Sequence, residues 1–281
     1  MEELEIKKDF SNIYTREFPT AYLEEMKRLQ YRIPDKTKPL YLAIADKLCE
    51  DLQRPINILD IGSSYGINSA LMKYGLEMYE LDDFFLRKNP PTKDDTKEFF
   101  SNLPINENLD FYQIDISEPA LKFSEDVGLC KKGICVNLDS TELPIKEVPP
   151  FDMVIATGCI GYIGHHAFSN LFEMLKKQES NSEPYFAFSV LRIFDMEKIQ
   201  KNFDYYGYSL VKSDIEPIRQ RRFSDDKEKQ NTLSLLHERG VDTGLYEDDG
   251  YFYADFYVAS PKKLESQLIN VSKSLKNHAI P

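Results

Sequence analysis

Long apolar runs are missing from this 281-residue sequence, and no stretch approaches the roughly 18 residues needed to span a bilayer. Its start, MEELEIKKDF, is charged and lacks the apolar core of a secretory signal. Cysteine is scarce, and of its four residues only Cys130 and Cys135 lie near each other, at a spacing unlike that of a zinc knuckle. We therefore expect a cytoplasmic protein with reduced thiols and with no membrane segment, disulfide framework or metal site.

Positive charge is also in short supply, because 35 Lys and Arg residues face 47 Asp and Glu residues, for a formal net charge of -12. Binding along a phosphate backbone depends on Lys and Arg releasing counterions, so an acidic chain is a poor candidate for it. The apolar share of 42% and the charged share of 29% are those of an ordinary globular protein. We expect one domain with additions and no nucleic-acid partner.

From Ile56 onward, short apolar runs alternate with helical patterns. Five runs are predicted to be strands: INILDI, LDFYQIDI, GICVNLD, FDMVIATG and PYFAFSVLRIF. Two more, YSLVKSDIEPI and YFYADFYVA, are expected to pair antiparallel at the sheet edge. Ser117 is the expected N-cap of the helix that follows the second run, and Gly128 its end. This order predicts a doubly wound, Rossmann-like α/β fold with a mostly parallel seven-stranded sheet.

Two segments stand outside this alternation. Residues 1–50 show helical spacing without a strand signal, and residues 77–108 are polar and rich in charge. We predict an N-terminal helical cap over residues 1–50 and a ligand-binding domain over residues 51–281, interrupted by an insertion at residues 76–108. Both additions are natural covers for a substrate.

The turn after the first predicted strand is the first candidate for a binding site, because ligands of doubly wound sheets lie beyond the carboxyl ends of the strands. There Asp60 precedes the sequence IGSSYG. Gly62 and Gly66 would let the backbone approach a ligand closely, and Ser64 is the next smallest choice between them. The helix that begins near Ile67 would offer free N–H groups to a carboxylate.

Acidic residues also end the next two predicted strands, at Asp115 and Asp139. Carboxylates can accept hydrogen bonds from a ribose diol and from an adenine amino group. Three acids at successive strand ends suit a nucleoside with an amino-acid tail, whereas they would oppose the charge of a phosphate.

These residues carry a resemblance to the class I methyltransferases that use S-adenosylmethionine (AdoMet). The segments LDIGSSYG, QIDISEPAL, NLDSTELP and FDMVIATGCIGYI resemble that family over about residues 56–194, with Ser64 in place of its middle glycine. The resemblance implies AdoMet as cofactor, with Asp60 near the methionine amino group, Asp115 at the ribose and Asp139 at the adenine. The full set of expected cofactor-binding residues is Asp60, Gly62, Ser64, Gly66, Asp115, Asp139 and Gly158.

One spacing departs from the family. The family usually places its ribose-binding acid about twenty residues past the glycine turn, as the dinucleotide-binding fold does. Here residues 77–108 intervene before Asp115. If Glu80 or Asp82 ended a hidden second strand instead, the assignment of Asp115 to the ribose would fail.

The loop after the fourth predicted strand, from Gly158 to His166, is the expected place for catalysis. His165 or His166 could take a proton from an acceptor, although vicinal histidines at a helix start are more often surface or capping residues. Tyr162 could orient an acceptor or simply pack.

Farther along the chain, Arg219 and Arg221 would share one face of an extended segment and could grip a substrate carboxylate or phosphate. A solvated strand end paired with Asp225 and Asp226 is the favoured alternative. Near the N-terminus, the aromatic residues Tyr14, Tyr22 and Tyr31 could line a substrate lid, with packing again favoured.

We therefore expect an AdoMet-dependent methyltransferase that acts on a small molecule, mainly by positioning donor and acceptor. An NAD(P)-dependent oxidoreductase is one alternative, but Ser64 and Ser69 leave the three-glycine dinucleotide fingerprint incomplete. A non-catalytic AdoMet-binding protein is the other, because intact cofactor residues do not require a catalytic base.

Overall fold

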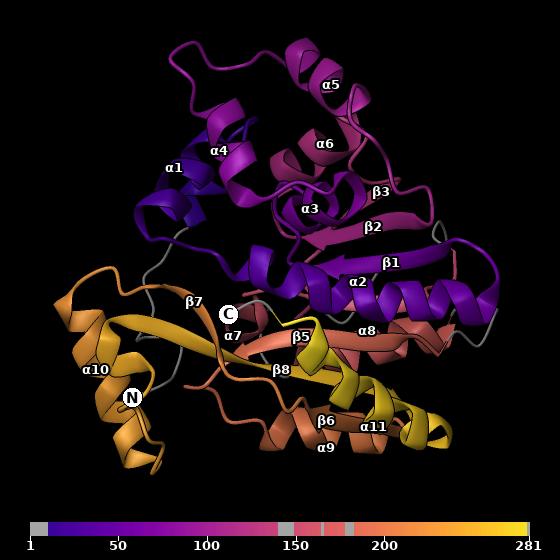
Figure 1. The fold of residues 1–281 in the computed structure, drawn as a ribbon, viewed down its shortest axis with the longest axis vertical. Coiled ribbons are helices and arrows are strands. Elements are labelled where there is room, and N and C mark those ends of the chain that lie inside the picture. The colour runs from indigo at the N-terminus through magenta and orange to yellow at the C-terminus, as the bar shows by residue number, and fades with distance from the viewer. Residues whose placement is uncertain (1–10, 140–148, 164–165, 178–182, 280–281) are drawn as a thin grey trace.

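The computed structural model describes residues 11–279 except for 140–148, 164–165 and 178–182 (Figure 1). Within these residues, eight strands form one sheet in the order β3-β2-β1-β4-β5-β8-β6, with β7 paired to β8 beside this path. The strands are β1 (Ile56–Ile61), β2 (Leu109–Asp115), β3 (Lys132–Cys135), β4 (Met153–Ala156), β5 (Tyr185–Leu191), β6 (Tyr208–Lys212), β7 (Ile218–Arg222) and β8 (Tyr251–Pro261).

The strand order confirms the predicted doubly wound fold. Strands β1 to β5 pair in parallel. Strands β2 and β3 follow on one side of β1, and β4 and β5 follow on its other side, so the strand order switches at β1. This is the 3-2-1-4-5-6 order of a dinucleotide-binding sheet with one antiparallel strand, β8, inserted between β5 and β6. The predicted antiparallel pairing of the last two strands is confirmed for β6 and β8, and β7 is an additional eighth strand.

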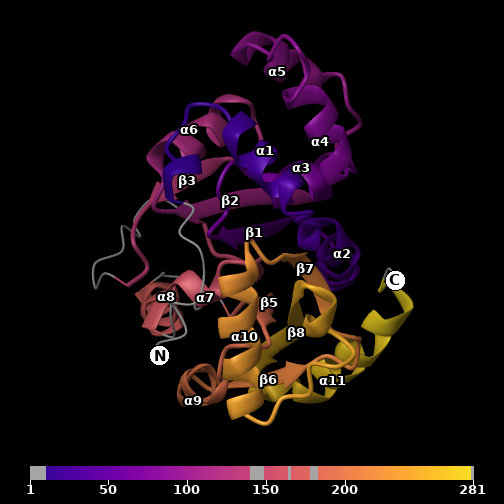
Figure 2. The ribbon, with the colours of Figure 1, turned by 90° about the vertical axis from the view of Figure 1, so that its left-hand side faces the viewer.

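Helices cover both faces of the sheet, as the short crossover connections require. Figure 2 shows α8 and α9 on one side of the sheet and α2 and α11 on the other. The described α-helices are α1 (Thr20–Arg28), α2 (Ile33–Leu52), α3 (Ile67–Tyr74), α4 (Met78–Phe85), α5 (Lys93–Ser101), α6 (Glu118–Asp126), α7 (Ile160–Ile163), α8 (His166–Lys177), α9 (Glu197–Tyr205), α10 (Asp226–Glu238) and α11 (Glu265–Ser274). None of them is both long and apolar enough to cross a bilayer.

The predicted caps of α6 are confirmed. Ser117 accepts a hydrogen bond from the backbone N–H of Ala120, and Gly128 has the positive φ of +79° that ends a helix readily. These caps fix where β2 ends and α6 begins, and so they fix the position of Asp115 between them.

A separate hydrophobic cluster joins the first helix to the inserted segment. Its buried residues come from α1, α3, α4, α5 and α6, and none comes from a strand. Asp82 of α4 lies 3.8 Å from the guanidinium of Arg32 and 4.0 Å from the ammonium of Lys27. Because residues 78–85 are helical, the alternative that Glu80 or Asp82 ends a hidden second strand is wrong.

Helix α2, unlike α1, packs against the sheet. Leu40, Tyr41 and Ile44 of α2 are buried in the core that lies on the sheet. The predicted boundary at residue 50 therefore falls inside a helix that packs on the sheet, and α1 is the N-terminal helix that shares a core with the insertion.

Candidate functional site

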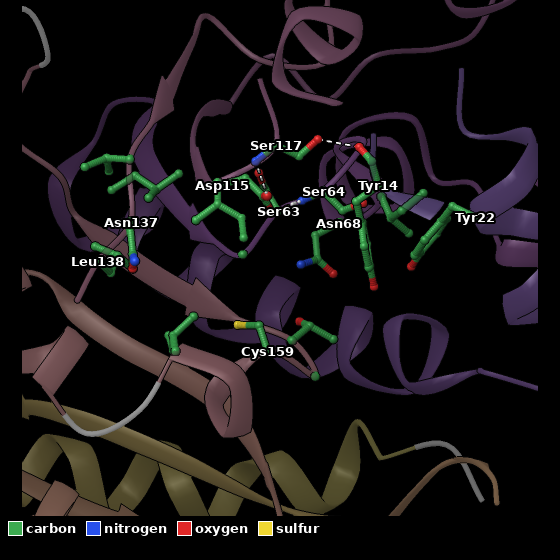
Figure 3. A pocket seen from close by; sticks show the side chains of 18 of the residues that line it. Tyr14, Tyr22, Ser63, Ser64, Asn68, Asp115, Ser117, Asn137, Leu138 and Cys159 are labelled. Atoms are coloured by element: carbon green, nitrogen blue, oxygen red, sulfur yellow. Dashed lines mark hydrogen bonds between the residues drawn. The ribbon is translucent and has the colours of Figure 1, made fainter. Parts of the chain in front are cut away.

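A cavity of about 510 Å³ opens at the carboxyl ends of β1, β2 and β4, where the strand order reverses (Figure 3). Its volume lies within the range of pockets that hold small ligands. The residues that line it come from the turn after β1, from α3, from the ends of β2, β3 and β4, and from the N-terminal segment. They are Tyr14, Thr15, Tyr22, Tyr31, Pro34, Gly62, Ser63, Ser64, Ile67, Asn68, Ile114, Asp115, Ile116, Ser117, Val136, Asn137, Leu138, Asp139, Thr157, Gly158, Cys159 and Ile163.

The turn after β1 forms part of the cavity wall. Gly62 has φ +63°, and a Cβ at this position would stand 2.6 Å from the Cβ of Cys159, so no larger residue fits without a shift. Ser64 also has a positive φ, +51°, at the position where the family has glycine. The hydroxyls of Ser63 and Ser64 are buried and have no hydrogen-bond partner among the described residues. Neither oxygen has appreciable exposed surface, so the two residues line the cavity through other atoms.

Gly66 serves the fold rather than the cavity wall. It is not among the lining residues, and a Cβ there would collide with the hydroxyl of Ser124 and approach the amide of Gln113. The glycine therefore allows the turn to pack against α6 and β2, which holds the rest of the turn in place.

Asp115 lies at the centre of the polar wall. Its carboxylate accepts hydrogen bonds from the backbone N–H groups of Ser64, at 2.8 Å, and Ser117, at 2.9 Å (Figure 3). Burial raises the pKa of Asp115, and these two N–H groups oppose the increase. The carboxylate thus links the turn after β1 to the end of β2 and lies at the surface of the cavity.

Asp60 is placed differently from the expectation. Its side chain has no exposed surface and does not line the cavity. Both of its oxygens accept hydrogen bonds from the Nδ2 of Asn68, at 3.0 and 3.1 Å, and burial raises the pKa of Asp60 to about 8. Asn68, in the first turn of α3, lines the cavity in its place. Sequence reasoning missed Asn68, whose only signal is its position one turn beyond the glycine segment.

The opposite end of the cavity lies beyond β3. Asp139 lines the wall there, is exposed, and its backbone N–H donates to the Oδ1 of Asn137 at 2.9 Å. Val136 and Leu138 add apolar surface to the same wall. An acidic group beside apolar side chains suits a flat heterocycle that carries an amino group.

Tyrosines of the N-terminal segment close the other end. The rings of Tyr14 and Tyr22 lie 5.5 Å apart between centroids, and the backbone carbonyl of Tyr14 accepts a hydrogen bond from the hydroxyl of Ser117. Tyr31 reaches the loop after β4, where a Cβ on Gly158 would stand 2.5 Å from its hydroxyl oxygen. All three tyrosines line the cavity, although the sequence favoured simple packing for them.

The expected catalytic residues remain predictions. His165 lies outside the described residues, and of Tyr162 the structure describes only the backbone, in α7. His166 is an exposed residue at the start of α8 and is not among the lining residues. Gly158, with φ +70°, does line the cavity and allows Tyr31 to approach β4.

The predicted substrate-binding arginines do not reach the cavity. A bulge between Arg219 and Arg221 breaks the alternation that would have placed both on one face. Arg221 is buried and forms two hydrogen bonds with Glu228, at 2.9 and 2.7 Å. Arg219 lies over the ring of Tyr251 at 4.5 Å.

The charges of the cavity have one sign. Asp115 and Asp139 are acidic, and no Lys, Arg or His is among the described residues that line the wall. Such a wall favours a cationic ligand and opposes a phosphate. Within the described chain, no group of three or more His, Cys, Asp and Glu residues could hold a metal ion.

Comparisons with known proteins found similar solved structures. No protein-family model and no curated protein matches the sequence. Similar solved structures include the magnesium protoporphyrin IX methyltransferase of Synechocystis PCC 6803 with bound SAM (AdoMet), at 12% identity, 80% coverage of each chain and a TM-score of 0.40. The plantazolicin methyltransferase BpumL in complex with SAH is 14% identical, with 91% of this chain and 96% of that chain covered and a TM-score of 0.41.

A third similar structure is the [4+2]-cyclase SpnF, at 12% identity, with 78% and 80% of the two chains covered and a TM-score of 0.39. At these identities and TM-scores the likeness is limited to the fold, so function has to be inferred from the residues of the cavity.

Proposed function

We propose that the protein is an AdoMet-dependent methyltransferase that acts in the cytoplasm on a small-molecule acceptor. The observation that carries the proposal is a cavity at the strand switch point whose charged residues are all acidic among those described. AdoMet presents a sulfonium and an ammonium, both cationic, together with a ribose diol and an adenine amino group. The donor and acceptor groups of this wall match that set.

Each part of AdoMet has a candidate residue on the wall. Asp115, which faces the cavity at the end of β2, would accept hydrogen bonds from the ribose hydroxyls. Asp139 would accept one from the adenine amino group, and the backbone at Gly62 would lie against the cofactor. The hydroxyls of Ser63 and Ser64 are buried as observed, so these side chains would have to rotate to donate to the carboxylate of the tail.

When bound, AdoMet supplies an activated methyl group for an in-line displacement. The protein's own contribution is then positioning, because a displacement from a sulfonium needs donor and acceptor held in line. Tyr31 and Gly158 form the wall where the loop after β4 meets the N-terminal segment, so they are suited to orient an acceptor. A cavity of about 510 Å³ that must also hold the cofactor leaves room for a small acceptor.

An oxidoreductase that uses NAD(P) fits this wall less well. Its cofactor carries a pyrophosphate, and acidic residues without a described cation nearby would repel that group. A non-catalytic AdoMet-binding protein would share the cofactor site, and turnover separates it from an enzyme.

The first test is isothermal titration calorimetry with AdoMet, S-adenosylhomocysteine and NAD⁺ on the wild type and on Asp115→Ala. We expect micromolar binding of the first two ligands and a loss of about tenfold or more, or about 1.4 kcal/mol, in the variant. Asp110→Ala is the control, because Asp110 is in the same strand but pairs with Lys131 at the surface, 2.5 Å away. Absence of AdoMet binding at millimolar concentration, or tighter binding of NAD⁺, would overturn the proposal.

A second measurement addresses catalysis. Incubation with AdoMet and a panel of small amines, phenols, thiols and carboxylic acids should yield S-adenosylhomocysteine in the presence of one acceptor class. Tight AdoMet binding without product formation across the panel would favour the non-catalytic alternative.

A further inference from the structure

We propose that Asn68 is the residue that receives the ammonium of the ligand's amino-acid tail, and that Asp60 acts behind it as a positioning residue. This inference rests on the proposed function and deepens it. It replaces the direct contact between Asp60 and the methionine amino group that the sequence suggested.

The burial of Asp60 excludes a direct role in the observed arrangement. Asp60 has no exposed surface, and its neighbours across the sheet are Gln113 of β2 and Ile155 of β4. Asn68 covers it from the cavity side, since both Asp60 oxygens lie within hydrogen-bond distance of the Asn68 Nδ2. A ligand in the cavity therefore meets Asn68 first.

The hydrogen bonds also fix which atom of Asn68 remains for a ligand. A side-chain amide has a donor end and an acceptor end. The carboxylate of Asp60 occupies the donor end, so the Oδ1 of Asn68 is the atom left to accept a hydrogen bond. The bond to the carboxyl group of Asp60 polarises the amide, and the partial negative charge of Oδ1 is suited to an ammonium.

The remaining groups nearby fit the other half of an amino-acid tail. The hydroxyl-bearing side chains of Tyr14 and Tyr22 lie beyond Asn68 on the same wall (Figure 3). Hydroxyls can donate to a carboxylate, whereas Asn68 Oδ1 cannot. This end of the cavity thus separates an acceptor for the ammonium from donors for the carboxylate.

The test uses three ligands that share the adenosyl group and the S-methyl group: AdoMet, decarboxylated AdoMet, which keeps the ammonium, and 5′-methylthioadenosine, which lacks both the tail and the sulfonium charge. Calorimetry should show that Asn68→Ala weakens the first two by about tenfold or more, as expected for loss of a charge-assisted hydrogen bond. Binding of 5′-methylthioadenosine should change less than about twofold, and this ligand also reports that the cavity is folded.

Two further variants complete the design. Asp60→Asn keeps the shape but prevents residue 60 from ionising when a cation binds nearby, so it should weaken the two ligands with ammonium groups selectively, by a smaller factor than Asn68→Ala. It also decides the question if Asn68→Ala does not fold. Asn57→Ala is the control, because Asn57 lies on the same strand but its side chain donates to the carbonyl of Pro150.

The outcomes are distinguishable. An equal loss of affinity for all three ligands in Asn68→Ala, or no loss for any of them, would overturn the role of Asn68. AdoMet binding by the wild type, and with it the proposed function, would still stand. If the wild type binds none of the three, the proposed function itself fails.

Discussion

Two of the regions that hold buried or partly buried acidic residues differ in the partners of those residues. At the corner between β7 and α10, Glu228 receives two hydrogen bonds from the guanidinium of Arg221, and both side chains are 3% exposed. At the switch point of the sheet, Asp60 and Asp115 are held by neutral donors, an amide and backbone N–H groups. The first region balances its charge internally, and the second leaves a net negative charge next to a cavity.

The difference explains why the basic cluster of the sequence was a misleading signal. A buried carboxylate needs a countercharge or several hydrogen bonds. In the β7–α10 corner the arginine supplies the countercharge, so that region is structurally complete without a ligand. At the cavity the countercharge is absent from the described wall, so a cationic ligand would complete it. Incomplete electrostatics, rather than the density of charged residues, marks the binding site.

The largest expected effect tests the buried ion pair of Arg221 and Glu228. Arg221→Ala should destabilise the protein by about 3–5 kcal/mol, because it leaves the Glu228 carboxylate buried without its partner. Arg219→Ala, an exposed neighbour, should change stability by less than about 0.5 kcal/mol. Urea denaturation measures both. If Arg221→Ala instead kept its stability but lost AdoMet affinity, β7 would belong to the ligand site and the contrast between the two regions would disappear.

The second effect tests the region beside the cavity through the pH dependence of protein stability. The folded-state pKa of Asp60 is raised from 3.8 to about 8 by burial, so between these values the folded protein holds a proton that the unfolded chain has released. Wild-type stability should therefore fall as pH rises through this window, by about 1.4 kcal/mol per pH unit from this group. The neighbouring titratable groups that interact with Asp60 include Asp115, Tyr22, Tyr41 and Cys130.

Asp60→Asn removes that titration. The contributions of the neighbouring titratable groups to the pH dependence of stability cancel when the variant is compared with the wild type. Without ligand, the stability of Asp60→Asn relative to wild type should increase from pH 5 to pH 8 and level off above it. A difference independent of pH would mean that Asp60 is ionised throughout, with its charge balanced as fully as that of Glu228.

The third effect concerns the glycine turn and has a matched control. Gly62 and Gly75 both have positive φ, +63° and +71°, so alanine at either should cost about 1–2 kcal/mol from backbone strain. A Cβ at Gly75 meets nothing within 4 Å, whereas one at Gly62 meets Cys159. Gly62→Ala should therefore be less stable than Gly75→Ala and should alone weaken AdoMet binding. Cys159→Gly in the Gly62→Ala background should recover part of the loss, and equal behaviour of the two glycines would contradict a close approach at the cavity.

Much of the fold was predictable because it follows from local patterns. Apolar runs between helical segments specified the seven strands of the main path, and Ser117 marked a helix start. Strand β7 was not predicted, because IRQRR has no strand pattern of its own. Its pairing with β8 and the burial of Arg221 against Glu228 are tertiary interactions that single-sequence patterns do not encode.

The same reasoning separates the predictable and unpredictable parts of the candidate site. Asp115 and Asp139 were found because the carboxyl ends of neighbouring parallel strands meet at one edge. Asn68 was not found, and Tyr14, Tyr22 and Tyr31 were named only as the less favoured alternative to packing, since their positions depend on how α3 and the N-terminal segment pack over the sheet. Asp60 shows the limit clearly: its place at a strand end was correct, but only the packing of α3 reveals that it is covered.

The smallest expected effect distinguishes the two ends of the cavity. Asp139 is exposed, so Asp139→Asn should weaken AdoMet by only about 0.5–1 kcal/mol, the value of a hydrogen bond that competes with water. Because adenine is common to AdoMet and 5′-methylthioadenosine, both ligands should lose the same amount, in contrast to the tail-selective loss expected of Asn68→Ala. A loss restricted to AdoMet would place Asp139 near the tail and would reverse the orientation of the cofactor in the cavity. Equal losses would leave Asn68 and Asp139 at opposite ends of one ligand, the end beside buried Asp60 contributing more binding energy than the end open to solvent.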